Sequence, residues 1–293
     1  MEFSDKAFFG KTLRSQIESF FKEDDLDKNS FYMERLPHGP VDCFLKFKTE
    51  GTLISGLPFF IECFSFLGVR NESLNHLLDK EGHLVKLNSD GAPLTLTFRL
   101  PFSVALTGER LALNLLQRSS SIATMTSEFV RKANEKGISI LDTRKTLPGL
   151  RFLDKYSVRV GGGKNHRFGQ TDVWMVKDNH KSFFGGVGEA ITFFRSMGGF
   201  YTPLVVEIHN LEELECAKNL NVKHFLLDNF GPEEIVEAVK MKKREMTFEV
   251  SGGMSLDNVE SYLIEGVDAI SVGCLTHSPQ LIDISMKLRK SEN

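Results

Sequence analysis

The chain has 293 residues, more than a usual single domain, so one large or two modest domains are expected. Hydrophobic residues make up 41%, enough for a sizeable core, and a formal charge of −3 gives no reason to expect nucleic acid. No apolar run is long enough for a membrane span, and residues 1–6 do not resemble a signal peptide. The widely separated cysteines, none with metal-ligand spacing, fit a reducing cytoplasm; they are Cys43, Cys63, Cys216 and Cys274.

Residues 1–106 mix helical and extended patterns. Apolar residues recur at helical spacing over residues 8–21, which predicts an amphipathic helix. Residues 41–48 and 94–100 are typical of strands, and Pro58 is well placed in the first turn of a helix rich in Phe. The 25 Phe residues are interpreted as core packing and not as a base-stacking surface. These elements predict a separate, smaller α+β domain over residues 1–106.

A long helical pattern follows from Thr107 to Lys136. Thr107 fits a helix N-cap with Arg110 in the first turn, and Gly137 fits a terminator. One long helix and two abutting ones are both compatible with the pattern. At such an N-terminus, Arg110 would join free N–H groups that favour an anion.

From Ile138 onward, short apolar strands alternate with helices, as in βα units of a parallel sheet. The predicted strands are 138–142, 173–177, 204–208, 224–228, 247–251 and 268–272, and the predicted helices include 189–196, 211–219, 232–242 and 256–265. In an α/β barrel the strand ends meet at one mouth, whereas an open doubly wound sheet would spread them along a crevice. Because the strands are too few for a complete eightfold barrel, we expect an incomplete, TIM-like parallel α/β barrel over residues 107–278. Residues 279–293 are predicted to be a helix that packs back on the N-terminal domain.

Cationic residues gather between Ile140 and His180 in this mildly acidic chain. They follow buried strands into Gly-rich loops, which predicts a fixed anion pocket; they include Arg144, Lys145, Lys164, His166, Arg167 and Lys177. Arginine suits a carboxylate because its planar fork makes two parallel hydrogen bonds, and lysine suits pyrophosphate as a point charge. An ion-pair network with nearby acids is the alternative.

Two glycine-containing loops and two carboxylates follow the later strands. Ser251-Gly252-Gly253 and the loop from Gly273 to His277 predict a phosphate site built from backbone N–H groups. Glu207 and Asp228 end adjacent predicted strands, and two carboxylates of this kind suit Mg²⁺ rather than zinc. They could instead be surface acids or partners of the cations.

These segments resemble the signature blocks of quinolinate phosphoribosyltransferases. The matching blocks are 109–110, 117–118, 142–146, 161–167, 177–180, 206–207, 227–229, 251–253 and 271–277. They lie in register from Thr107 to Leu288, and the resemblance is weak before Leu94. It implies an incomplete barrel and a cytoplasmic enzyme of NAD synthesis. That enzyme would convert quinolinate and phosphoribosyl pyrophosphate into nicotinate mononucleotide, pyrophosphate and CO₂.

The resemblance also implies residue roles. The quinolinate carboxylates would be bound by Arg110, Arg144, His166 and Arg167. Lys145 and Lys177, with Mg²⁺, would stabilise the leaving pyrophosphate, and Glu207 and Asp228 would hold the metal and the ribose hydroxyls. The 5-phosphate would be bound by Ser251, Gly252, Gly253, Ser271, Gly273 and His277. Arg110 would enter the site of a neighbouring subunit, which implies at least a homodimer with shared sites.

Three positions depart from the family pattern. Lys164 stands where Arg is commoner, Ser121 where Gly is frequent, and His209 where an acid is frequent. Ser121 could crowd a close backbone approach, and His209 would make the metal neighbourhood less negative. The alternatives to the implied function are a related pyrophosphorylase acting on another small acid and a non-catalytic phosphate-binding barrel.

Overall fold

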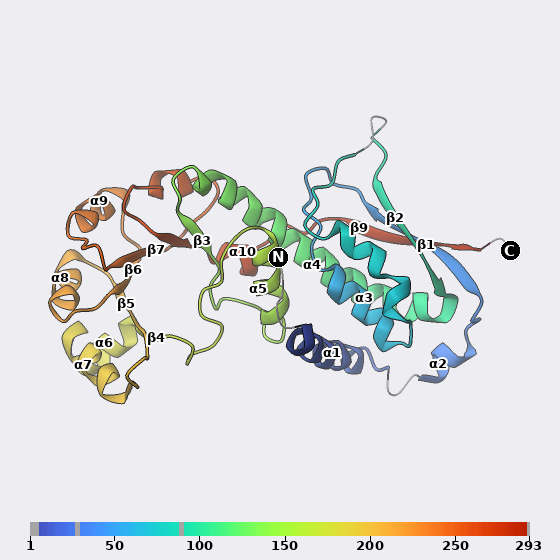
Figure 1. Cartoon of the computed structure of the whole chain (residues 1–293), viewed down its shortest axis with the longest axis horizontal. Helices are drawn as coiled ribbons and strands as arrows, with labels where there is room; N and C mark the ends of the chain where they lie inside the picture. The colour runs from blue at the N-terminus through green and yellow to red at the C-terminus, as the bar shows by residue number, and fades with distance from the viewer. Residues whose placement is uncertain (1–5, 27–29, 88–90, 292–293) are drawn as a thin grey trace. The chain divides into compact units, whose positions relative to one another are not determined.

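The computed structural model describes residues 6–26, 30–87 and 91–291, which form two compact units (Figure 1). Unit 1 comprises the chain up to residue 125 together with 148–161 and the segment from 279 onward. Unit 2 comprises residues 126–147 and 162–278. The division differs from the predicted boundary at residues 106 and 107, because most of the long helix and a second helical segment belong to unit 1.

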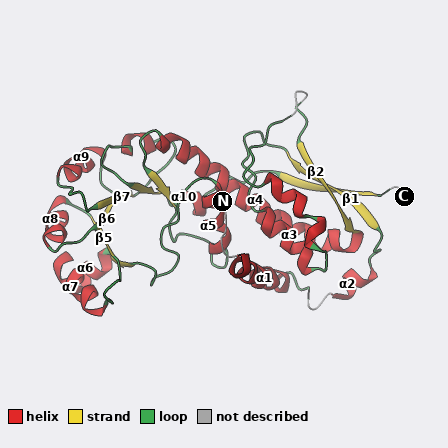
Figure 2. Ribbon diagram, viewed as in Figure 1, coloured by secondary structure: helices red, strands yellow, loops and turns green. Residues whose placement is uncertain are grey.

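Unit 1 is built on a three-stranded antiparallel sheet with the order β2-β1-β9 (Figure 2). Its strands are β1 (Pro40–Phe47), β2 (Leu94–Pro101) and β9 (Ile284–Lys290). Its helices include α1 (Lys6–Glu23), α2 (Ser30–Arg35), α3 (Leu57–Phe66), η1 (Asn71–Ser73), η2 (Asn75–Lys80) and α5 (Arg151–Val160). Alternate residues of β1 are buried, as the period of two along a strand requires when one face packs on a core.

The predicted C-terminal helix is wrong, because this segment forms strand β9. It pairs antiparallel with β1, from Val41 opposite Lys290 to Phe47 opposite Ile284. Ile284 and Met286 are buried and alternate with polar residues, which is the period of a half-buried strand and not of a helix. The strand therefore completes the sheet of unit 1.

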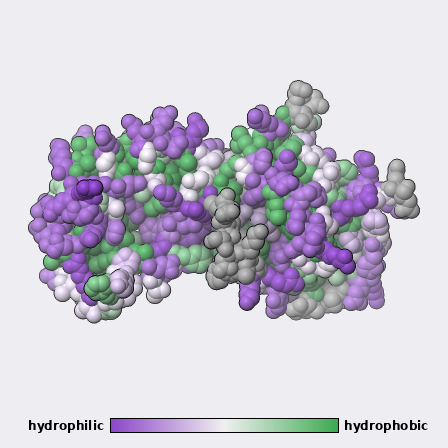
Figure 3. Space-filling model, in the orientation of Figure 1, coloured by the Kyte–Doolittle hydropathy of each residue, from purple (hydrophilic) through white to green (hydrophobic). Residues whose placement is uncertain are grey.

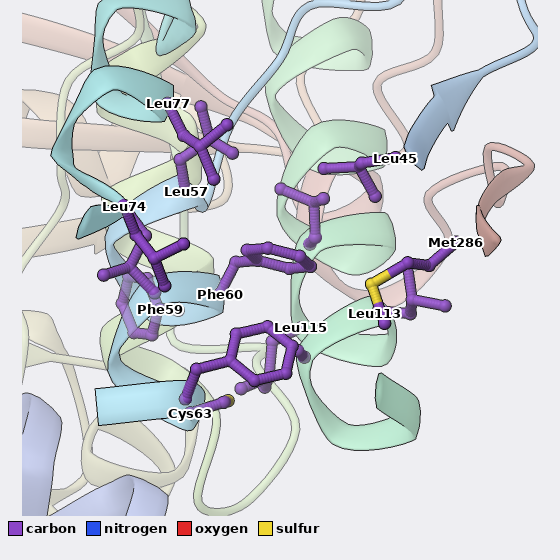
Figure 4. Close-up of a cluster of buried hydrophobic side chains, with 14 of the residues drawn as sticks. Leu45, Leu57, Phe59, Phe60, Cys63, Leu74, Leu77, Leu113, Leu115 and Met286 are labelled. Atoms are coloured by element: carbon purple, nitrogen blue, oxygen red, sulfur yellow. The ribbon is translucent and has the colours of Figure 1, made fainter. Parts of the chain in front are cut away.

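The core of unit 1 is rich in Phe (Figure 4). Phe59, Phe60 and Phe64 on α3 are fully buried, and the Phe60 ring lies 5.7 Å from the ring of Phe98 on β2. Burial of one such side chain stabilises the fold by roughly 1.5–3 kcal/mol. The interpretation as core packing is confirmed for these Phe residues of unit 1, whereas Phe183 and Phe200 are exposed.

The structure confirms the alternative of one long helix, which is α4 (Phe102–Asn134). It begins directly after β2, so Thr107 is not an N-cap. The Thr107 hydroxyl instead donates to the carbonyl of Ser103 at 2.8 Å, as hydroxyls inside helices do. Arg110 is consequently an exposed residue in the helix interior, and the argument from a helix N-terminus is wrong.

Unit 2 is a six-stranded parallel sheet flanked by helices. Its strands are β3 (Ser139–Leu141), β4 (Trp174–Val176), β5 (Leu204–Ile208), β6 (His224–Asp228), β7 (Thr247–Ser251) and β8 (Ala269–Ser271), so all the predicted strands are confirmed. Its helices include α6 (Asp178–Phe184), α7 (Val187–Met197), α8 (Leu211–Asn219), α9 (Pro232–Lys240), η3 (Val259–Tyr262) and α10 (Cys274–His277). The helix predicted over 256–265 is reduced to η3, because the Asn258 side chain bonds the backbone of Ser255 and Gly253 and competes with helix formation.

The strand order β3-β8-β7-β6-β5-β4 is that of a barrel interrupted between β3 and β4. On the free edge of β3, Lys164 forms a parallel bridge with Leu141. Its N–H donates to the Ile140 carbonyl at 2.8 Å, so this loop lies beside the strand. The expectation of an incomplete parallel α/β barrel is confirmed over the doubly wound alternative.

The face shown in Figure 3 is mostly hydrophilic, with apolar residues in scattered patches. In the part of the chain that the structure describes, no helix combines the length and the apolar character that a bilayer crossing requires. All four cysteines are free thiols.

Candidate active site

A cavity of about 430 Å³ opens at the carboxyl ends of the strands of unit 2, the edge where α/β barrels place their sites. Each strand contributes to it directly or through the loop that follows. The predicted residues that line it are Arg144, Lys145, His166, Arg167, Lys177, Glu207, Asp228, Ser251 and Ser271. The structure thus brings the predicted cations, carboxylates and hydroxyls together. Thr143, Met175, Leu226 and Glu249 also line the cavity and were not predicted as site residues.

Two arginines form the basic side of the cavity. The Nε of Arg144 is buried and has no hydrogen-bond partner, so a donor is left unsatisfied there. Arg167 uses Nη1 to donate to the carbonyls of Gln170 (3.1 Å) and Val173 (2.9 Å), which fixes its side chain. Burial, and next the nearby Arg144, lower the pKa of Arg167. Because an unsatisfied buried donor is costly, this pair of guanidinium groups is prepared for an anion.

The buried Asp142 positions the loop that carries His166 and Arg167. One carboxylate oxygen accepts from the backbone N–H of His166 at 2.9 Å, and the other accepts from the Asn165 side chain. Asp142 follows directly after β3, so the sheet fixes its position. This carboxylate therefore holds the loop at the mouth of the barrel.

Hydrogen bonding determines which ring nitrogen of His166 carries the proton. The backbone N–H of Arg167 donates to His166 Nδ1 at 2.7 Å, so Nδ1 must be unprotonated. The proton of the neutral ring is then on Nε2, which lies 3.4 Å from Oε1 of Glu249. His166 consequently presents an Nε2–H donor to the cavity.

Glu249 is an ionisable residue of the cavity that was not predicted from the sequence. Burial raises its pKa to about 7, the Ser271 hydroxyl that donates to Oε1 opposes this shift, and Asp142 adds to it. Glu249 precedes Ser251 by two residues on β7, so both side chains lie on one face of the strand. The spacing of two residues from Ser251 was therefore the signal in the sequence that could have identified Glu249 as a site residue.

Glu207, His209 and Asp228 offer ligand atoms that lie within 4.8 Å of one another. The ammonium group of Lys181 donates to His209 Nδ1 at 2.6 Å, so Nε2 carries the proton of the neutral ring. Nε2 lies 3.6 Å from Glu207 Oε1 and 3.5 Å from Asp228 Oδ2. The Nε2 side of His209 therefore faces the two carboxylates at distances longer than a normal hydrogen bond, and Glu207 and Asp228 remain as the oxygen ligands that a hard cation prefers.

Lys145 and Lys177 lie beside different parts of the site. Lys177 Nζ is 3.9 Å from Glu207 Oε2. The main-chain carbonyl of Lys145 accepts from the Thr276 hydroxyl at 2.9 Å, which fixes it beside the loop from Gly273 to His277. Basic side chains and the glycine loops thus share one end of the barrel.

Gly252 is required by its conformation and its surroundings. Its φ is +112°, and a Cβ there would lie 2.8 Å from the backbone N and 2.9 Å from the Cα of Asn229. Gly253 also has a positive φ, of +57°, but a Cβ there would meet nothing within 4 Å. The loops after β6 and β7 can thus approach closely only if residue 252 is glycine, whereas residue 253 does not limit this approach.

Gly252→Ala should lower the free energy of unfolding by more than about 2 kcal/mol, because conformational strain and a backbone clash add together. Gly253→Ala should cost only about 1–2 kcal/mol, the penalty of a left-handed residue. Thermal unfolding of the two variants measures the difference. Equal melting temperatures would show that the contact with Asn229 does not constrain the loop.

Other predicted residues lie outside the cavity lining. Arg110 belongs to unit 1 and is not among the residues that line this cavity. Gly252, Gly253, Gly273 and His277 do not line the cavity but neighbour residues that do.

The departures at Lys164 and Ser121 have local explanations. Lys164 directs Nζ to the Ser139 hydroxyl at 3.0 Å and does not line the cavity. The buried Ser121 hydroxyl donates to the Gln117 carbonyl (2.6 Å) and accepts from the Ile282 N–H (3.1 Å), both within unit 1. Ser121 thus bonds the segment that leads into β9.

Comparison with known proteins identifies a family, curated relatives and solved structures whose names agree with one another. The family described as "Quinolinate phosphoribosyl transferase, C-terminal domain" matches residues 122–287. The chain is 38% identical to the probable nicotinate-nucleotide pyrophosphorylase [carboxylating] of Bacillus subtilis, covering 95% of this chain and 94% of that protein. It is 34% identical to the enzyme of that name from Homo sapiens, covering 96% and 93%. The solved nicotinate-nucleotide pyrophosphorylase of Francisella tularensis superposes with a TM-score of 0.81 at 28% identity, covering 94% of this chain and 97% of that one.

Proposed function

The chain belongs to the quinolinate phosphoribosyltransferase family, and we infer that it is a pentosyltransferase of NAD biosynthesis. It transfers the phosphoribosyl group of phosphoribosyl pyrophosphate to quinolinate, and it releases pyrophosphate and CO₂ to give nicotinate mononucleotide. The observation in the structure that supports this most directly is the cavity, where two guanidinium groups and two lysines share one mouth with two carboxylates.

The two arginines suit the two carboxylates of quinolinate. Arg144 has a buried, unsatisfied Nε–H, and Arg167 is fixed by its loop with further N–H groups to donate. His166 would add an Nε2–H donor. Because these groups are held before the substrate arrives, they bind with little ordering cost and orient the ring nitrogen toward the sugar.

The glycine loops and the lysines suit phosphoribosyl pyrophosphate. Backbone N–H groups after β7 and β8 would bind the 5-phosphate, with the residues Ser251, Gly252, Gly253, Ser271, Gly273 and His277. Lys145 and Lys177 would stabilise the pyrophosphate as it leaves. Their flexible, compact charges fit an anion whose position changes during the reaction.

Charge develops on both partners as the pyridine nitrogen attacks the anomeric carbon. Positive charge grows on the ribose ring, and Glu207 and Asp228 would face it while also holding the ribose hydroxyls. The same two oxygen ligands would hold Mg²⁺, which would supply neutralising charge to the pyrophosphate. His209, directed by Lys181, would face both carboxylates with its Nε2–H.

Arg110, the subunit arrangement and the location of the enzyme complete the proposal. We propose that Arg110 contributes to the quinolinate site of a second copy of the chain, so that the working unit is at least a homodimer with shared sites. The free cysteines fit a cytoplasmic enzyme.

Arg167→Ala should raise the quinolinate KM strongly and leave the affinity for phosphoribosyl pyrophosphate nearly unchanged. Loss of one member of a desolvated charge pair costs roughly 2–5 kcal/mol. Steady-state kinetics with each substrate varied in turn measures the two effects. Arg195→Ala, which removes an exposed arginine of α7, is the matched control and should behave as the wild type. Normal quinolinate affinity in folded Arg167→Ala would contradict the assignment.

Release of CO₂ from carboxyl-labelled quinolinate tests the function as a whole. The enzyme should release one CO₂ for each pyrophosphate, and only when phosphoribosyl pyrophosphate is present. A related pyrophosphorylase would release pyrophosphate with another acid and leave quinolinate intact. A non-catalytic barrel would bind phosphoribosyl pyrophosphate and release neither product.

A further inference from the structure

The carboxyl group of Glu249 lies in the cavity with one oxygen engaged and the other available. Oε1 accepts from the Ser271 hydroxyl and faces the Nε2–H of His166 at 3.4 Å. Among the described residues Oε2 makes no hydrogen bond. It is also absent from the fully buried atoms that lack a partner, so it is accessible, and Glu249 lines the cavity. In a carboxylic acid arranged in this way, Oε1 accepts the hydrogen bond from Ser271 and Oε2 can carry the acid proton.

The surroundings of Glu249 favour the neutral acid. The group is largely buried, and its pKa is raised to about 7, with Asp142 adding to the effect of burial. The backbone N–H of Arg167 donates to His166 Nδ1, so the Nε2 side of that ring is the one that faces Oε1. The other charged groups that line the cavity are Arg144, Lys145, Arg167, Lys177, Glu207 and Asp228.

We propose that Glu249 is the general acid of the decarboxylation, delivering the proton that replaces the lost carboxylate on the pyridine ring. The inference rests on the proposed function, because only that reaction leaves a ring carbon in need of a proton. Glu249 adjoins His166, which belongs to the predicted quinolinate site, and both line the cavity, so a quinolinate ring bound there would lie beside the carboxyl group of Glu249.

The step balances without a further reactant. After the N-glycosidic bond has formed, the bond between the carboxylate and the ring carbon next to the nitrogen breaks, and CO₂ leaves. The electron pair stays on that carbon, where the cationic pyridinium nitrogen stabilises it. The Oε2 proton of Glu249 forms the new C–H bond as the bond to the carboxylate breaks, so that loss of CO₂ and protonation of the carbon occur in one step, and the resulting carboxylate is reprotonated from solvent.

Glu249→Gln tests the proposal because the amide keeps the shape and the Oε1 acceptor but cannot act as an acid. General acids contribute typically 10²–10⁴-fold, so CO₂ release should slow by about 10²-fold or more. In a single turnover, pyrophosphate should still be released at nearly the wild-type rate. The carboxylated mononucleotide, quinolinate joined to the phosphoribosyl group, should accumulate and be detected by mass spectrometry.

The pH profile provides a second readout. Protonated Glu249 is the active form, so wild-type CO₂ release in single turnover should fall as the pH rises through about 7. Glu249→Gln should lack that limb. Glu245→Gln, the same substitution at an exposed position just before β7, is the matched control and should keep wild-type rates and profile.

The outcomes separate the proposal from its alternatives. If Glu249→Gln lowers pyrophosphate and CO₂ release together and raises the quinolinate KM, Glu249 positions His166 and the proposal is wrong. If CO₂ release keeps its wild-type rate, the proton comes from elsewhere and the proposal is likewise wrong. If the wild-type enzyme itself releases no CO₂ from quinolinate, the proposed function has failed, independently of Glu249.

Discussion

Activity should reappear when inactive Arg110→Ala subunits exchange with inactive Lys145→Ala subunits. If Arg110 reaches the site of a neighbouring subunit, a mixed twofold dimer has one site with both changes and one with neither. Each mixed dimer should therefore approach about half of the wild-type activity, as symmetry requires. The assay measures pyrophosphate release after exchange, with the mixed dimers verified by mass-tagged subunits.

A second mixture controls this experiment. Arg144 and Lys145 line the same cavity within unit 2 of one chain. Mixed dimers of Arg144→Ala and Lys145→Ala should stay inactive, because every site then carries one change. If verified mixtures with Arg110→Ala also stay inactive, Arg110 does not act across subunits as proposed.

Glu207→Gln combined with Asp228→Asn should abolish the response of turnover to magnesium while the protein stays folded. Metal ions contribute several kcal/mol to stabilising developing charge, and each 1.36 kcal/mol is tenfold in rate, so about a 10³-fold loss is expected. Titration of activity with MgCl₂ measures the response, and circular dichroism checks the fold. A retained magnesium response would assign the two carboxylates a structural role.

The matched control removes the same charges elsewhere in unit 2. Glu233 and Asp257 are exposed carboxylates outside the cavity. Glu233→Gln with Asp257→Asn should leave the magnesium response unchanged. A loss of response in this control would attribute the effect to the overall charge of the unit and not to the site.

Local sequence patterns predicted the strands of unit 2 and most of the residues that line its cavity. Strands such as 204–208 and 224–228 were found because they are short, apolar and bounded by turn residues. Parallel strands bring their carboxyl ends to one edge, so residues at those ends, such as Glu207 and Asp228, could be predicted to meet. Local pattern and a general rule of topology were sufficient there.

Features that depend on partners distant in the chain could not be predicted from local patterns. The C-terminal segment is a strand because β1 offers it an edge, and β1 lies more than 200 residues earlier. Thr107 falls inside α4 because the helix starts immediately after β2. Glu249 is recognised as a buried acid only when Ser271, His166 and Asp142 are seen around it, since its pKa is determined by burial and neighbours that the local sequence does not specify.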